Sequence, residues 1–173
     1  ATPASRVSKS FDFTTIREIV SLDNLRDAKK RKARIAKLLR RGLKHPPNAA
    51  EAEEYLQELA RGARKGRSID WELVERFVEI DPAASPPPSH HGTHVAGIAA
   101  GNGVGAGQTF SGVARGAQVM AVQVFSQVDN PLACGGVAPC LGGFSSDIIA
   151  GLEHVYALAA THHIVAVNMS LGE

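Results

Sequence analysis

The distribution of charge and glycine divides this 173-residue chain into two unlike parts near residue 80. Residues 1–80 contain 18 of the 19 lysines and arginines but only 3 of the 17 glycines. Residues 81–173 contain one basic residue, Arg115, and the other 14 glycines. This contrast predicts two segments that fold differently, 1–80 and 81–173. The sequence DPAASPPPS at their junction, with four prolines, predicts a stiff extended linker or an ordered loop.

The first segment has apolar residues at helical spacing. A narrow apolar stripe predicts a helix over residues 25–43, which ends before His45 and two prolines. Asn48 is expected to cap a second helix over residues 49–66, and Ser68 is expected to cap a third. The apolar face of the third helix would consist of Trp71, Val74, Phe77 and Val78. We therefore expect residues 1–80 to be mainly α-helical.

Ten basic residues and one acidic residue lie between Arg26 and Lys44. Such a helix can contact nucleic acid or another anionic partner, and the same pattern is typical of a solvated face on a helical hairpin. Aromatic residues are not interleaved with the basic ones, which argues against a stacking surface for single strands. The basic segment 1–80 thus leaves open a non-catalytic protein that binds an anionic partner.

The second segment has the pattern of an α/β fold. Short β-branched runs at residues 118–125 and 164–169 predict buried strands. Between them, residues 146–160 have apolar positions at helical spacing, and Ser146 or Asp147 stands where the cap belongs. Strand, helix and strand in this order predict a parallel crossover unit. A further helix is expected over residues 94–101.

Three histidines, His90, His91 and His94, fall within the sequence SHHGTHVAG. A zinc site of the H-E-x-x-H type would need a glutamate after its first histidine, and none is present, so we expect no metal here. A structural role at a helix start is the second alternative. The third is a general base, because the positive end of a helix disfavours a protonated imidazole and a base must begin neutral. The spacing alone leaves the last two alternatives open.

Four segments in order resemble the subtilisin-like serine peptidases, the subtilases. They are HGTHVAGIAAG at 91–101, SGVA with AQVMAVQV at 111–124, the helical sequence at 146–158, and VNMSLG at 167–172. The resemblance implies part of a subtilisin-like parallel sheet with flanking helices, running from the histidine motif to the NMSLG strand. It also implies a serine endopeptidase that hydrolyses polypeptides by a Ser-His-Asp mechanism.

Residue by residue, the resemblance makes His91 the general base and His94 a buried packing residue. It assigns no role to His90. Ser170, Leu171 and Gly172 match the strand that lies along the substrate backbone. Residues 77–81 resemble the end of a subtilase propeptide.

The triad of this family runs Asp, His, Ser along the chain. No aspartate before His91 stands in a D-[TS]-G context, and no G-T-S-M-A turn is present in the sequence. The resemblance therefore predicts an incomplete catalytic domain, and we expect this chain alone to be inactive.

Cys134 and Cys140 enclose a short loop that can close a disulfide, as a secreted subtilase would allow; free cysteines are the alternative. The resemblance implies an extracellular protein and no cofactor. No apolar run is long enough to predict a transmembrane helix.

Overall fold

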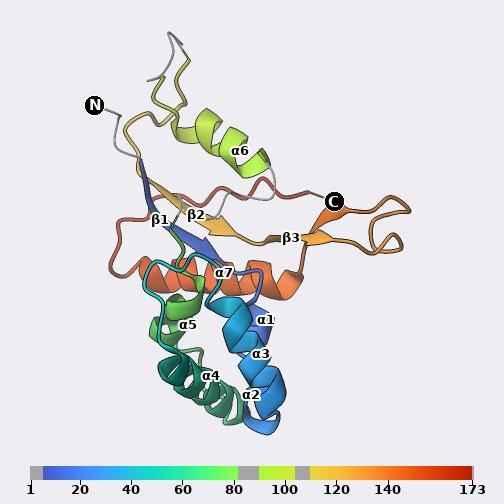
Figure 1. Cartoon of the computed structure of the whole chain (residues 1–173). Coiled ribbons are helices and arrows are strands. Elements are labelled where there is room, and N and C mark those ends of the chain that lie inside the picture. The colour runs from blue at the N-terminus through green and yellow to red at the C-terminus, as the bar shows by residue number, and fades with distance from the viewer. Residues whose placement is uncertain (1–5, 82–89, 104–109, 173) are drawn as a thin grey trace.

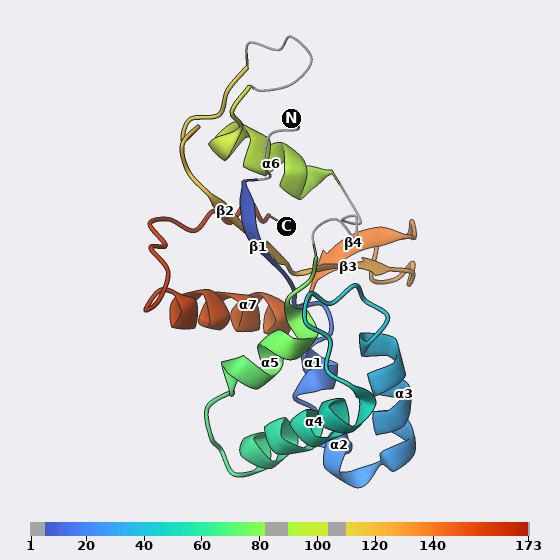
Figure 2. The same ribbon diagram turned by 60° about the vertical axis from the view of Figure 1, so that its left-hand side comes forward.

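The computed structural model describes residues 6–81, 90–103 and 110–172, so the predicted linker, apart from Asp81, lies outside the described residues. Three layers are visible in Figures 1 and 2. Helix α6 (His91–Ala100) lies on one side of two parallel strands, and α7 (Ser145–Leu158) lies on the other. The five helices that fall within residues 16–78 lie beyond α7. The predicted α/β chain with a mainly helical first segment is confirmed.

Strand β1 (Val7–Asp12) was not predicted, because residues 1–80 were expected to be helical apart from their loops. It pairs in parallel with β2 (Val119–Gln123), the strand predicted over 118–125. The register places Phe11 opposite Val122 and Asp12 opposite Gln123. On its other edge, β1 is covered by the backbone of residues 79–80, since the Ile80 amide donates to the Ser10 carbonyl at 2.9 Å. The first segment thus contributes a strand to the sheet of the second.

The predicted helices of the first segment are present with different ends. The stripe over 25–43 forms α2 (Asp23–Arg26) and α3 (Ala28–Leu38), because the Asp27 side chain caps α3 by accepting from the Lys30 amide. Gly42, with φ of 67°, lies beyond its end. Before them comes the short α1 (Ile16–Ile19).

Helix α4 (Ala49–Arg64) begins as predicted at Asn48, which forms a capping box with Glu51. Helix α5 (Trp71–Val78) is capped by the side chain of Asp70 rather than by Ser68. An aspartate immediately before the helix reaches the Leu73 amide, at 3.3 Å.

In the second segment, α6 and α7 match the predicted helices, but two details differ. The N-cap of α7 is Phe144, and neither Ser146 nor Asp147 caps it. Residues 164–169 were predicted to form a buried strand, and this prediction is wrong. In the structure they form no strand ladder and are largely exposed, with Val165 at 94%. Residues 164–167 and one side of α7 line an open apolar groove of about 350 Å³.

Strand β3 (Phe125–Val128) follows β2 closely and pairs with β4 (Cys140–Gly143) as an antiparallel hairpin. The hairpin projects beyond the layered body in both views (Figures 1 and 2). It leads directly into α7.

One hydrophobic core joins the two segments. Its members from the first segment include Phe11, Phe13, Ile16, Leu38, Leu56 and Phe77. Val124, which directly precedes β3, belongs to the same core, as do Ala150 and Leu158 of α7. The division at residue 80 stays a prediction; what the structure establishes is that both sides of it bury apolar surface together.

Candidate functional site

His91 is the first residue of α6, and its side chain is exposed. Helix α6 is held in place at its other end, where residues 112–114 run along its last turn. Three backbone bonds connect them: Gly112 N to Gly101 O at 2.7 Å, Val113 N to Ile98 O at 3.1 Å, and Ala114 N to Ala99 O at 2.8 Å. The fit is close, because a Cβ on Gly112 would lie 2.6 Å from the Gly101 nitrogen. The position of His91 therefore rests on an anchored helix.

The Nε2 atom of His91 lies 3.0 Å from the carbonyl oxygen of Ser170. A carbonyl can only accept, so Nε2 is the donor. Asn168 lies next to this contact, and its Nδ2 donates to the Ser170 hydroxyl at 3.1 Å. The structure thus brings together two of the residues singled out in the sequence, 79 positions apart.

Leu171 and Gly172 continue from this contact as an exposed segment without regular secondary structure. A Cβ on Gly172 would meet nothing within 4 Å. Gly172 therefore has open space on its Cβ side.

The other two histidines of the motif take no part in this contact. His94 was expected to be buried, and this expectation is wrong, since its side chain is exposed on α6. His90 is the N-cap residue of α6 but makes no side-chain cap bond. Among the described residues, no three His, Cys, Asp or Glu side chains come together as metal ligands.

Sequence reasoning missed an aspartate that ends a parallel strand. Asp12 is the last residue of β1. Its Oδ1 accepts from the Thr14 amide at 3.0 Å and from the Thr14 hydroxyl at 2.6 Å, and its Oδ2 is paired with the Arg41 guanidinium. Its carboxylate is thus neutralised within the first segment. The sequence gave no signal for Asp12, because β1 is only weakly apolar and Asp12 is not part of a D-[TS]-G sequence.

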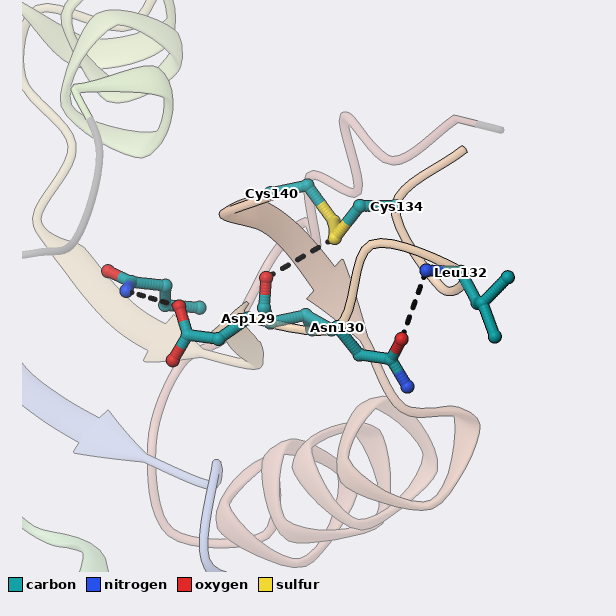
Figure 3. The surroundings of a disulfide bond; sticks show 7 residues. Asp129, Asn130, Leu132, Cys134 and Cys140 are labelled. Atoms are coloured by element: carbon teal, nitrogen blue, oxygen red, sulfur yellow. Dashed lines mark hydrogen bonds between the residues drawn. A yellow bond between two sulfur atoms is a disulfide. The ribbon is translucent and has the colours of Figure 1, made fainter. Parts of the chain in front are cut away.

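Cys134 and Cys140 form a disulfide that closes the loop of the β3–β4 hairpin (Figure 3). Their Cα atoms are 5.6 Å apart. The loop also contains a local turn, in which Asn130 Oδ1 accepts from the Leu132 amide at 3.0 Å. The disulfide is part of the hairpin and not of the His91 contact.

The basic run from Arg26 to Lys44 is largely neutralised inside the first segment. Six of its ten cations form ion pairs: Lys30 with Asp23, Arg31 with Glu53, Arg34 and Lys37 with Glu18, Arg41 with Asp12, and Lys44 with Glu79. Over the described ranges, the other four form no ion pair: Arg26, Lys29, Lys32 and Arg40. Most of this charge is therefore paired within residues 1–80.

His154 on α7 is fully buried against the first segment. Its ring lies among the rings of Phe11, Phe13 and Trp71, at centroid distances of 4.7, 5.4 and 5.3 Å. Its Nε2 is 3.4 Å from Glu75 Oε1. Burial lowers the pKa of His154 to about 4, and the nearby Lys9 ammonium acts in the same direction, while Glu79 opposes them. The imidazole is therefore neutral at neutral pH.

The pKa values of Glu75 and Glu79 shift in opposite directions. Burial raises the pKa of Glu75. Burial also acts to raise the pKa of Glu79, but hydrogen bonds from Lys44 and Lys9 outweigh it and lower that pKa. Glu79 is thus held ionised beside His154.

The structure thus places a histidine at the start of an anchored helix against an exposed segment, and both were implied by the sequence resemblance. Comparison with models of protein families matches residues 70–173 to the subtilase family. This match covers more than half of the chain, so the chain belongs to the subtilase family. The match begins at Asp70, the cap of α5, inside segment 1–80.

Comparisons with curated proteins and with solved structures found no match to this chain. In the parts of the chain that the structure describes, no helix has the length and apolar character that crossing a bilayer requires.

Proposed function

We propose that this chain carries part of the active site of a subtilisin-like serine endopeptidase, with His91 as the general base. The observation that carries the proposal is the contact of His91 with Ser170, which joins the base of the histidine motif to the NMSLG segment. In this mechanism the imidazole takes the proton of a serine hydroxyl as the hydroxyl attacks the peptide carbonyl. It then returns that proton to the leaving amine.

Membership of the family makes a polypeptide the substrate class. We propose that Ser170, Leu171 and Gly172 bind the backbone of an extended substrate. The exposed backbone of Leu171 and Gly172 supports this role, because it leaves their peptide groups available for hydrogen bonds to a second strand. A substrate bound here would lie beside the imidazole.

We also propose that this 173-residue chain does not turn over peptides alone. Its sequence contains no G-T-S-M-A turn to supply the nucleophile, and Asp12 is engaged by Arg41 and Thr14. Loss of the nucleophile removes most of the rate that a triad provides. Casein and a peptide anilide test this: we expect no hydrolysis above buffer. Hydrolysis that His91→Ala abolishes would overturn it.

The gene sequence on both sides of this chain tests the peptidase function. We expect a G-T-S-M-A turn downstream and hydrolysis of casein by the product that contains it. A reading frame without such a turn, or a product that contains it and leaves casein intact, would argue against the function.

We propose that the protein is extracellular. The disulfide between Cys134 and Cys140 supports this location, because such bonds persist mainly in oxidising compartments. Fractionation of the producing cells, with detection of residues 90–172 by antibody, measures it directly. We expect the signal in the medium, and a signal confined to the cell interior would contradict the proposal.

A further inference from the structure

We propose that the outer face of α3 binds the phosphate backbone of duplex nucleic acid. Three exposed cations, Lys29, Lys32 and Arg40, together with the exposed Ala33 and Ala36, make up this surface, which we call the cationic face. Its residues lie outside the family match at 70–173, so binding here is independent of the peptidase function.

Ion pairing divides the basic side chains on α3 into two groups. One group is held by acidic side chains of the first segment: Lys30, Arg31, Arg34 and Lys37. The other group belongs to the cationic face and has no ion-pair partner in the ranges that the structure describes. Lys29 and Lys32 are neighbours three positions apart on the helix, so their like charges repel each other unless an anion lies beside them.

The cationic face is one continuous stripe. It contains residues at intervals of four, three and four: Lys29, Ala33, Ala36 and Arg40. Such spacing places side chains on the same side of a helix. Arg40 continues the helical turn beyond the end of α3, since its amide donates to the Lys37 carbonyl at 3.3 Å. At a rise of 1.5 Å per residue, the stripe is about 16 Å long.

The opposite side of α3 faces the core. Ile35 and Leu38 are buried there, and Figure 2 shows α3 at the edge of the helical layer. The cationic face therefore points away from the protein. Between Lys32 and Arg40 its side chains are alanines, so a negatively charged backbone can lie close to the helix surface.

Charge density and shape favour a duplex over other polyanions. Duplex DNA carries one negative charge per about 1.7 Å of its axis, so a stripe of this length meets several phosphates. Single strands are bound largely by stacking on aromatic side chains, and residues 26–44 contain none. Insertion into lipid needs large apolar side chains, whereas the cationic face offers only alanine. A protein in the medium meets duplexes released from lysed cells, which agrees with the extracellular location proposed above.

The affinity of the full chain for a short labelled duplex, measured by fluorescence anisotropy at several salt concentrations, tests this surface. We expect the logarithm of the association constant to fall with the logarithm of salt concentration at a slope of about −3, since each of three cations neutralises a phosphate and contributes about −0.9. Duplexes of different sequence should bind equally, because phosphates carry no sequence information.

Two double variants remove the same charge from exposed positions of the same helix. Lys29→Gln with Lys32→Gln takes two cations from the cationic face, and the slope should change to about −1. Lys30→Gln with Lys37→Gln is the matched control, which removes two paired cations and should leave the slope at about −3. Circular dichroism should show the helix content of the parent chain in both.

Three results would overturn the inference. They are no duplex bound at the lowest salt concentration, equal changes of slope in the two double variants, and binding of a sulfated polysaccharide or of phosphatidylserine vesicles by a chain that leaves the duplex free. None of these measurements uses catalysis, so failure of the peptidase function would not change them.

Discussion

Arg17 Nε donates a hydrogen bond to Asp147 Oδ1 over 3.0 Å, and this ion pair ties α1 to the first turn of α7. The two residues are 130 positions apart, one in each segment of the chain. The Asp147 carboxylate is fully buried, whereas the Arg17 side chain is 44% exposed and lies over the Phe144 ring at 3.6 Å. This ion pair and the shared hydrophobic core together hold residues 1–80 against residues 81–173.

The unequal burial of this pair predicts unequal effects of mutation. Arg17→Met leaves a buried carboxylate without its cation, and we expect it to lower the free energy of unfolding by about 2 kcal/mol. Asp147→Asn leaves an exposed guanidinium that water solvates, so its cost should be smaller, about 1 kcal/mol. Urea denaturation of both variants measures the difference.

Lys30→Met serves as the control, because its pair with Asp23 is exposed and should contribute less than about 1 kcal/mol. A loss for Asp147→Asn as large as that for Arg17→Met would contradict the asymmetry.

His154 is buried between the two segments, and this predicts that the free energy of unfolding depends on pH. Its pKa is about 4 in the folded chain and 6.5 as an ordinary histidine, so the unfolded state binds the proton first as pH falls. The contribution is fully present above pH 6.5 and is lost progressively down to pH 4. Its full size is at most about 3 kcal/mol. Denaturation by urea at pH values from 7 to 5 should show this decline.

His154→Leu removes the titrating group and should flatten that part of the curve. Glu75 opposes the decline, because burial raises its pKa and its protonation therefore favours the folded state as pH falls. An unchanged slope in the variant would show that another group carries the pH dependence.

The close approach of Gly112 to α6 predicts a steric effect on the helix that carries His91. An added Cβ would lie 2.6 Å from the Gly101 nitrogen and 2.7 Å from the Ala100 nitrogen, so the 112–114 segment would have to shift. We expect Gly112→Ala to cost about 2 kcal/mol. Hydrogen exchange of the α6 amides should accelerate accordingly.

Gly97→Ala is the matched change within α6. Nothing lies within 4 Å of its added Cβ, so alanine should slow exchange slightly through its better helix propensity. Equal effects from the two alanines would rule out the steric explanation.

The disulfide predicts a local effect on the β3–β4 hairpin. Cys134 and Cys140 are six positions apart, and closing so short a loop contributes about 2 kcal/mol. The Cys134→Ser, Cys140→Ser variant should therefore lose protection of the β3 and β4 amides while the β1 and β2 amides stay protected. Loss of protection throughout the sheet would mean that the bond supports the whole fold.

Local signals in the sequence identified most helices and strand β2, but not the strand that pairs with β2. The capping box of Asn48 and Glu51 is a short-range pattern, and α4 begins where that pattern predicts. Strand β1 has polar residues at Ser8, Lys9 and Ser10, and its pairing partner lies more than a hundred residues away, so no local period reveals it. The run at 164–169 shows the reverse case. Its β-branched composition predicts a strand, yet a strand also needs a partner, and the described residues provide none there.

The candidate site was predicted in part. The histidine motif identified His91, and the NMSLG segment identified Ser170, but only the fold brings the two together. The same geometry shows that the contact uses a backbone carbonyl, which no residue pattern encodes. Asp12 was missed for a similar reason, since its place at a strand end depends on β1 being a strand.

Hydrolysis of casein tests most directly the proposed role of His91 as the general base of a subtilisin-like peptidase. The protein to assay is the gene product that joins this chain to a serine-bearing G-T-S-M-A turn, with His163→Ala as an exposed histidine control. We expect His91→Ala to lower kcat by roughly a million-fold, the loss seen when the triad histidine of subtilisin is removed, and the control to keep its activity. A His91→Ala protein that hydrolyses casein at the rate of the unmodified product would contradict the account.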